Sequence, residues 1–206
     1  MDWLMSFGQR RSDRKHEKLN PHSLTLPGSE RIHQSLLVKP NDLLETPPDE
    51  DVTTIFDLLQ RAVKLTNNGK FIGERAADGS IEWISYKQAI EDAKSMGSAL
   101  LHFGIEAGES TRVGIAGLNS SRYMITQYAL LSYSIVAVPL YYNYKFDALC
   151  EIINNCDLEV IFCDTLGRAE SFIKCANDGM LTSLKRIIIM DRNVQFHDVP
   201  HQDCQQ

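Results

Sequence analysis

The sequence lacks the runs and motifs that mark several large classes of protein. No window approaches the ~18 apolar residues of a membrane-spanning helix, so any membrane association is expected to be peripheral. The apolar start, residues 1–7, is too short for a secretory signal and is followed by charges. There is no G-x-S-x-G elbow, no C-x-x-C pair, no G-x-G-x-x-G and no P-loop. No catalytic, cofactor-binding or metal residues can therefore be assigned from motifs.

The five cysteines are an odd number without zinc-site spacing. Four lie in stretches with core character, so we expect reduced, buried thiols of an intracellular protein. These four are Cys150, Cys156, Cys163 and Cys175, and the fifth is Cys204. His197, His201 and Cys204 have the residue types of a metal site, but Pro200 prevents a helix from presenting both histidines on one face. We expect no metal there.

Proline and charge set residues 1–50 apart. Five of the seven prolines fall in this segment, which prevents long regular elements. The prediction is a disordered basic leader, with peripheral membrane contact as the alternative. The residues that suit such contact are Trp3, Leu4, Met5 and Phe7, followed by Arg10, Arg11, Arg14, Lys15 and Lys18. The rest of the chain is acidic and has no basic stripe, which argues against nucleic-acid binding.

Order is expected from Val52, beginning with a helix. Thr53 or Thr54 can cap it, and residues 67–69, Asn-Asn-Gly, can end it in left-handed conformations. Its apolar positions follow helical spacing at Ile55, Leu58, Leu59, Ala62 and Val63.

A hairpin and a second helix come next. Residues 70–75 and 81–86 flank an Asp-Gly turn, which predicts a β-hairpin. Ser85 and Gln88 predict a capping box for a helix that Gly104 closes. Its apolar face includes small residues that suggest close packing against a neighbouring element. That face consists of Ala89, Ile90, Ala93, Met96, Gly97, Leu100 and Leu101.

From residue 111 onward, short apolar runs alternate with helical patterns. Strands are expected at 113–116, 135–140, 160–163 and 186–190, and helices from Ser120 or Ser121 and at 146–155 and 165–176. Runs that are apolar at every position are typical of strands covered on both faces. The prediction is an α/β fold: a Rossmann-like parallel sheet flanked by helices, with right-handed crossovers. It occupies residues 51–192, and residues 193–206 are expected to form an irregular tail.

In an open parallel sheet, ligands bind beyond the carboxyl ends of the strands. Those ends are residues 117–119, 141–143, 164–165 and 191–192. The first is a glycine-containing turn before a helix N-terminus, which could offer amides to an anion. The preferred interpretation is a structural turn in which Asn119 bonds its own backbone.

Other polar residues near these ends also have two interpretations. Residues 141–144, three tyrosines and an asparagine, could stack a planar ligand, or pack in the core or against a subunit. Asp164 and Asp191 could bind a cation or a ribose, although such residues more often cap the next helix, and Asp164 before Thr165 suits that role. His102 lies near a helix end, where a cation complements the dipole.

Several blocks stand in the order found in one family. They are Val52-Thr-Thr-Ile-Phe56, Asn67-Asn-Gly69, Glu82-Trp-Ile-Ser-Tyr-Lys-Gln88, Gly97-Ser-Ala-Leu-Leu101, Val113-Gly-Ile-Ala-Gly-Leu-Asn119, Tyr133-Ser-Ile-Val-Ala-Val-Pro-Leu-Tyr141 and Leu184-Lys-Arg-Ile-Ile-Ile-Met-Asp191. From about residue 50 to 191 the chain resembles the N-terminal region of long-chain fatty acyl-CoA synthetases, of the AMP-binding, adenylate-forming superfamily. Two departures, 120–123 and 142–145, fall at strand ends, so the resemblance allows a divergent substrate-side surface.

The resemblance implies a reaction in which ATP and Mg²⁺ activate a fatty acid to an acyl-adenylate, from which the acyl group passes to CoA. The family's phosphate loop ending Pro-Lys-Gly, its adenine and ribose motifs and its catalytic C-terminal lysine are absent from these 206 residues. The expectation is an N-terminal fragment or truncated isoform of a ligase, inactive alone, in the cytoplasm or peripheral on the endoplasmic reticulum or another membrane. The alternative is a non-catalytic module that pairs with a full-length synthetase through an apolar surface. A third is an unrelated small Rossmann-like binding domain.

Overall fold

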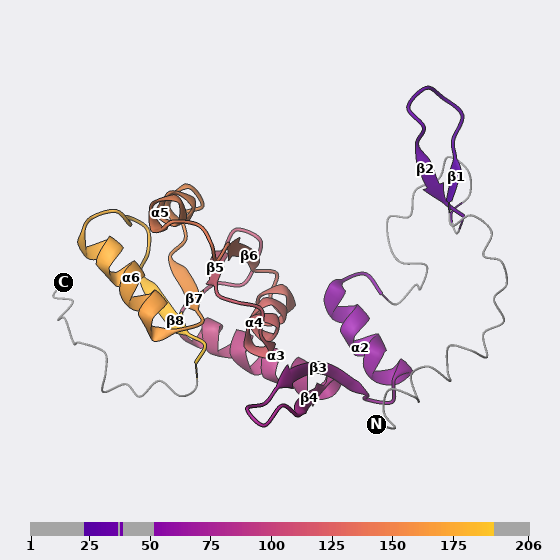
Figure 1. Ribbon diagram of the computed structural model, residues 1–206, viewed down its shortest axis with the longest axis horizontal. Coiled ribbons are helices and arrows are strands. Elements are labelled where there is room, and N and C mark those ends of the chain that lie inside the picture. The colour runs from indigo at the N-terminus through magenta and orange to yellow at the C-terminus, as the bar shows by residue number, and fades with distance from the viewer. Residues whose placement is uncertain (1–22, 37, 39–51, 192–206) are drawn as a thin grey trace. The chain divides into compact units, whose positions relative to one another are not determined.

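The computed structural model describes residues 23–36, 38 and 52–191, which fall into two units described separately (Figure 1). In the first unit, strands β1 (Ser23–Thr25) and β2 (His33–Ser35) pair antiparallel, with Ser23 opposite Ser35. This hairpin lies inside the segment expected to be a disordered leader and was not predicted. The basic patch, the apolar start and the histidines near the C-terminus lie outside the described residues.

The second unit begins with helix α2 (Ile55–Leu65), as the sequence predicts. Thr54 is its N-cap and forms a complete capping box with Asp57, whose carboxylate accepts hydrogen bonds that lower its pKa. Asn67 and Asn68 end the helix with φ of 51° and 54°. The predicted apolar residues lie on α2 as expected, but this face is not fully buried, because Ile55 and Leu58 remain more than half exposed.

The predicted hairpin is present as β3 (Lys70–Arg75) and β4 (Ile81–Ser85), which pair antiparallel. Helix α3 (Tyr86–His102) follows, capped by Ser85, which accepts from the Gln88 amide. The predicted reciprocal half of this capping box is wrong, because the Gln88 side chain donates to Asp92 instead.

Helices α3 and α4 (Ser121–Ser132) pack closely because small residues line their contact. A Cβ on Gly97 would overlap the Tyr133 ring and lie 3.2 Å from the Ala129 carbonyl oxygen. The tight approach predicted from the small residues of α3 is therefore confirmed. Leu101, which the sequence placed on the same apolar face, is 38% exposed.

Four parallel strands form the main sheet: β5 (Arg112–Ala116), β6 (Val136–Leu140), β7 (Val160–Cys163) and β8 (Arg186–Ile189). Their spatial order is β6-β5-β7-β8. Helix α5 (Phe146–Asn155) connects β6 to β7, and α6 (Leu166–Asn177) connects β7 to β8. The predicted α/β fold is confirmed, with element boundaries within about two residues of those expected.

Side chains alternate between the two faces of this sheet and pack into two hydrophobic clusters. Val113 and Ile115 of β5 join a cluster with Leu100 of α3 and Leu130 of α4. On the opposite face, a second cluster joins β5, β6 and β7 to helices α5 and α6. Its buried members are Ala116, Leu140, Leu149, Cys150, Ile153, Leu158, Ile161, Cys163, Ala169, Phe172, Cys175 and Leu181. Both faces of the sheet are thus covered, which explains strands that are apolar at every position.

The buried thiols of this second cluster are expected to resist alkylation. Burial raises the pKa of Cys150 and of Cys163 to about 12. At pH 8 only about one thiol in 10⁴ is then a thiolate. In the folded chain, iodoacetamide is expected to leave both unmodified and to modify the partly exposed Cys156, as read by peptide mass spectrometry. In urea all three should react, and equal labelling of all three without urea would contradict this burial.

Candidate functional site

The strand order places a topological switch point between β5 and β7. The chain moves from β5 outward to β6 and from β7 outward to β8, so the crossovers diverge at the centre of the sheet. Ligands of doubly wound proteins bind outside the carboxyl ends of the strands at such a point. Here that position is a cavity of about 220 Å³ lined by Glu74, Leu118, Ser120, Arg122, Asp164 and Met190.

Asp164, directly after β7, links the carboxyl ends of β7 and β5 at the switch point. Its Oδ2 accepts a hydrogen bond of 3.0 Å from the Leu118 amide, in the turn that leaves β5. Gly117 permits this approach, because a Cβ there would lie only 2.8 Å from the Asp164 Cβ. The turn is therefore structural, as preferred from the sequence, but Asp164 rather than Asn119 supplies the side-chain bond.

Asp164 in turn contacts Arg168, in the first turn of α6. The Arg168 Nε lies 3.4 Å from Asp164 Oδ1, at ion-pair distance but without hydrogen-bond geometry. The guanidinium stacks 3.9 Å from the centre of the Tyr142 ring, and its NH2 group donates to the Tyr142 carbonyl at 3.5 Å. Thr165, not Asp164, caps α6, so the predicted capping role of Asp164 is wrong.

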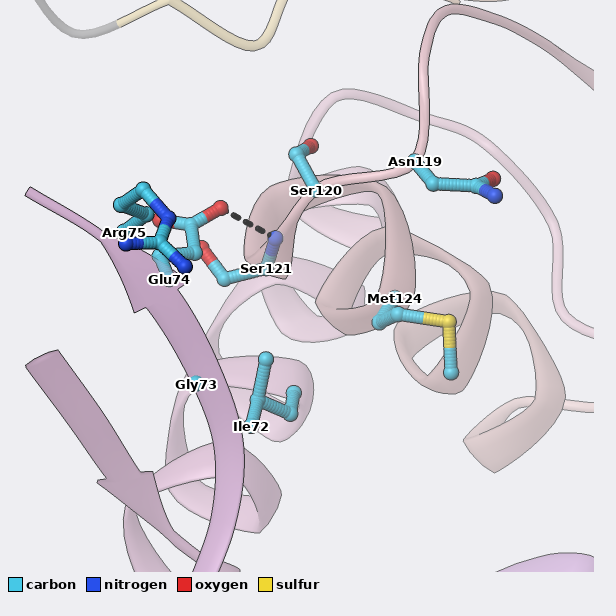
Figure 2. A pocket seen from close by; sticks show the side chains of 8 residues that line it. All are labelled: Ile72, Gly73, Glu74, Arg75, Asn119, Ser120, Ser121 and Met124. Carbon is cyan, nitrogen blue, oxygen red and sulfur yellow. Dashed lines mark hydrogen bonds between the residues drawn. The ribbon is translucent and has the colours of Figure 1, made fainter. Parts of the chain in front are cut away.

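Glu74 of β3 occupies the N-terminus of α4 (Figure 2). Its Oε1 accepts from the Ser121 amide at 2.5 Å, while Ser120 Oγ accepts from the Tyr123 amide. These contacts lie at an open pocket of about 600 Å³ between the hairpin and α4. Figure 2 shows the Asn119 side chain directed away from Glu74. A carboxylate already satisfies the helix terminus that would otherwise attract an anion.

Arg122 ties the end of β8 to the same region. Its NH1 donates to the Met190 carbonyl at 2.7 Å and lies 3.3 Å from the Asp191 carboxylate. Asp191 therefore has an arginine partner. Within residues 52–191 and the described part of the leader, no three His, Cys, Asp or Glu side chains are grouped to hold a metal ion.

The tyrosines after β6 separate into two environments. The rings of Tyr141 and Tyr144 meet edge to face at 5.2 Å and are both more than half exposed, whereas Tyr142 lies under Arg168. His102 is the last residue of α3, where its predicted place at a helix end is confirmed.

Sequence reasoning missed Glu74, Arg122 and Arg168. Arg168 had a local signal, since it follows Asp164 by four residues on a predicted helix. Glu74 had none, because its partner amide is 47 residues away. Taken together, the carboxylates and guanidinium groups at the switch point are paired with each other and with backbone groups. These contacts hold the ends of the strands and the neighbouring helices together at this edge of the sheet.

Comparison with known proteins agrees with this fold. A family model described as AMP-binding enzyme matches residues 63–204. The chain belongs to the AMP-binding enzyme family. Long-chain-fatty-acid–CoA ligase 1 of Cavia porcellus is 35% identical over 173 residues, which are 84% of this chain and 25% of the relative. Long-chain-fatty-acid–CoA ligase 5 of Mus musculus is 36% identical over 141 residues, 68% of this chain and 21% of the relative.

The crystal structure of an anthranilate CoA ligase in complex with anthranoyl-AMP superposes with a TM-score of 0.57 at 20% identity. The match covers 74% of this chain and 26% of that chain, and it shows a shared fold. The chain spans about a quarter of the length of the curated relatives it matches. The resemblance to long-chain acyl-CoA ligases is thus confirmed. None of the described helices of this AMP-binding family member is long and apolar enough to cross a bilayer.

Proposed function

We propose that this chain is the N-terminal part of a long-chain fatty acid–CoA ligase, in which it serves as scaffold. The overall reaction converts fatty acid, ATP and CoA to acyl-CoA, AMP and pyrophosphate. Support comes from the identity to two such ligases and from the AMP-binding family match. In this proposal the 206 residues do not catalyse the reaction by themselves.

The observation that carries this proposal is the pairing of polar groups at the switch point. Transfer of a nucleotidyl group needs donors and cations aimed at the phosphate oxygens. The two arginines nearest the switch point, Arg122 and Arg168, are engaged by Met190, Asp191, Tyr142 and Asp164. The α4 terminus, an alternative donor, is engaged by Glu74. In this proposal these engaged groups are not the donors to a triphosphate, and no step of the reaction is assigned to the described residues.

The test is an assay of oleoyl-CoA formation from oleate, ATP, Mg²⁺ and CoA by the purified 206-residue chain. Intact long-chain-fatty-acid–CoA ligase 1 of Cavia porcellus is the positive control. We expect no product above the blank from a chain that circular dichroism shows to be folded. Turnover that scales with its concentration would overturn the proposal that it is inactive alone.

A chimera tests the scaffold role itself. Residues 52–191 would replace the matching segment of the Cavia porcellus ligase, and the chimera is expected to retain oleoyl-CoA formation. A folded chimera without activity would show that this segment does not substitute for the ligase scaffold. A second chimera carrying Gly117→Val, which clashes with Asp164, should lose activity and serves as the negative control.

A further inference from the structure

Three buried cysteines lie in the layer that helices α5 and α6 form on one face of the sheet. They are Cys150 of α5, Cys163 of β7 and Cys175 of α6, and all three belong to the same hydrophobic cluster. A single buried thiol packs as a small apolar group and needs no further explanation. Two thiols placed against each other are different, because an oxidant can join them in a disulfide. This feature of the core is independent of the proposed function.

Helices α5 and α6 run in the same direction, because each connects one strand of the parallel sheet to the next. On α5, Phe146 and Cys150 are four residues apart and share a helix face. On α6, Phe172 and Cys175 are three residues apart and also share a face. The ring centres of Phe146 and Phe172 lie 5.1 Å apart. One turn further along both helices, Cys150 therefore comes opposite Cys175.

A second contact lies one turn beyond the thiols. Asn154 follows Cys150 by four residues, and its Nδ2 donates to the Met180 carbonyl at 2.8 Å. The Met180 amide donates to the Cys175 carbonyl at 2.9 Å, which ties this contact to the end of α6. Cys150 and Cys175 thus lie between two observed contacts of the same pair of segments, and these contacts fix their register.

The two thiols also interact directly. Burial raises the pKa of Cys150 to about 12, and a hydrogen bond between its thiol and that of Cys175 adds to this rise. Among the described residues, no other thiol contributes to the raised pKa of Cys163, which burial causes. The buried thiols of the cluster therefore form one pair and one single cysteine.

We propose that Cys150 and Cys175 are an oxidation site, at which a peroxide converts the two thiols to a disulfide between α5 and α6. Cys175 reacts first, because it is 8% exposed against 3% for Cys150 and lies in the last turn of α6. The high pKa of Cys150 also makes it the poorer first nucleophile at neutral pH.

The reaction takes two steps. The Cys175 sulfur attacks one oxygen of hydrogen peroxide, so that an S–O bond forms and the O–O bond breaks. Hydroxide leaves, takes up the proton of the Cys175 thiol and becomes water, and a sulfenic acid remains. The Cys150 sulfur then attacks the sulfenic sulfur, and the hydroxyl group leaves with the Cys150 proton as a second water. Two thiols are oxidised to one disulfide, and the peroxide is reduced to two waters.

The disulfide would close a loop from residue 150 to residue 175 that contains all of β7. A cross-link of this kind stabilises a fold mainly by restricting the unfolded chain. For a loop of this length, the equilibrium constant of unfolding is expected to fall on the order of 10²-fold. Urea denaturation of the oxidised and the reduced chain measures this change.

Peptide mass spectrometry of the full chain tests the pairing. The folded chain is treated with millimolar hydrogen peroxide, and the remaining thiols are then blocked in urea. Trypsin together with a glutamate-specific protease places the four described cysteines on separate fragments: residues 146–151, 152–159, 160–168 and 175–185. We expect fragments 146–151 and 175–185 to be linked, and the link to be lost in dithiothreitol. Oxidation in urea, where the helices are unfolded, should link the fragments without this preference.

Three variants separate the pair from the single buried thiol. Cys150→Ala and Cys175→Ala should each unfold at the same urea concentration before and after peroxide treatment. Cys163→Ala removes a buried thiol of the same cluster and should keep the stabilisation by peroxide. The mass measurement on the unmodified chain decides the matter if a variant fails to fold.

A link from Cys175 to any cysteine other than Cys150 would overturn the proposal. So would a folded chain in which peroxide leaves Cys150 a free thiol, whether Cys175 stays reduced or is oxidised further. Stabilisation by peroxide that persists in Cys175→Ala would equally show that this pair is not the site.

Discussion

Replacing Phe172 by alanine is expected to lower the free energy of unfolding by about 3–5 kcal/mol. Phe172 is fully buried on α6, and its ring meets that of Phe146 edge to face at 5.1 Å. It packs in the cluster that joins α5 and α6 to the sheet. Truncation removes this contact and leaves a cavity that the surrounding helices and strands can fill only in part.

The adjacent residue supplies the control for that experiment. Ile173 lies on the same helix but is 37% exposed, so Ile173→Ala should cost about 1 kcal/mol or less. Urea denaturation followed by far-ultraviolet circular dichroism measures both. Equal losses for the two variants would contradict the assignment of the α5–α6 face as core.

Replacing Asp164 by alanine is expected to lower the free energy of unfolding by about 2–4 kcal/mol. The side chain is 16% exposed and that of Arg168 is 10% exposed, so solvent screens their interaction only in part. Alanine would leave the Leu118 amide without its acceptor and the Arg168 guanidinium without its carboxylate. The turn after β5, which carries the switch point, would lose its tie to β7.

Two further variants separate the parts of that loss. Asp164→Asn retains an oxygen that can accept from the Leu118 amide and removes the charge. It should therefore lower the free energy of unfolding by less than Asp164→Ala does. A double-mutant cycle with Arg168→Met isolates the ion pair. A coupling energy near zero, together with an unchanged Asp164→Asn variant, would show that the hydrogen bond alone holds the turn.

The sequence was most informative where the pattern is local. Strand β7 and helix α5 were predicted with their observed bounds, because a buried apolar run and a helical period are properties of the segment itself. Asn67 and Asn68 ended α2 as expected, since their left-handed tolerance is also local. The collinear blocks from about residue 50 to 191 likewise identified the family that the comparisons support.

Contacts between distant segments, and the burial they cause, were harder to predict from the sequence. The spacing of Ile55 and Leu58 predicts an amphipathic helix, but no local pattern states whether another element covers that face. Two competing partners for the Gln88 side chain were equally compatible with the sequence: the Ser85 amide, which would donate to it, and the Asp92 carboxylate, which accepts from it. The bond from the Ser121 amide to Glu74 depends on the hairpin folding onto α4, which spacing alone does not specify.

The most direct test of the scaffold assignment is an NMR titration of the folded chain with ATP and Mg²⁺. The amides of Leu118, Ser121 and Arg168 report on the switch point, because each lies at one of its paired groups. With those groups engaged by Asp164, Glu74 and Thr165, we predict that these amides do not shift at millimolar nucleotide. Saturable shifts at these three amides would contradict the account and make this edge a nucleotide site of the chain itself.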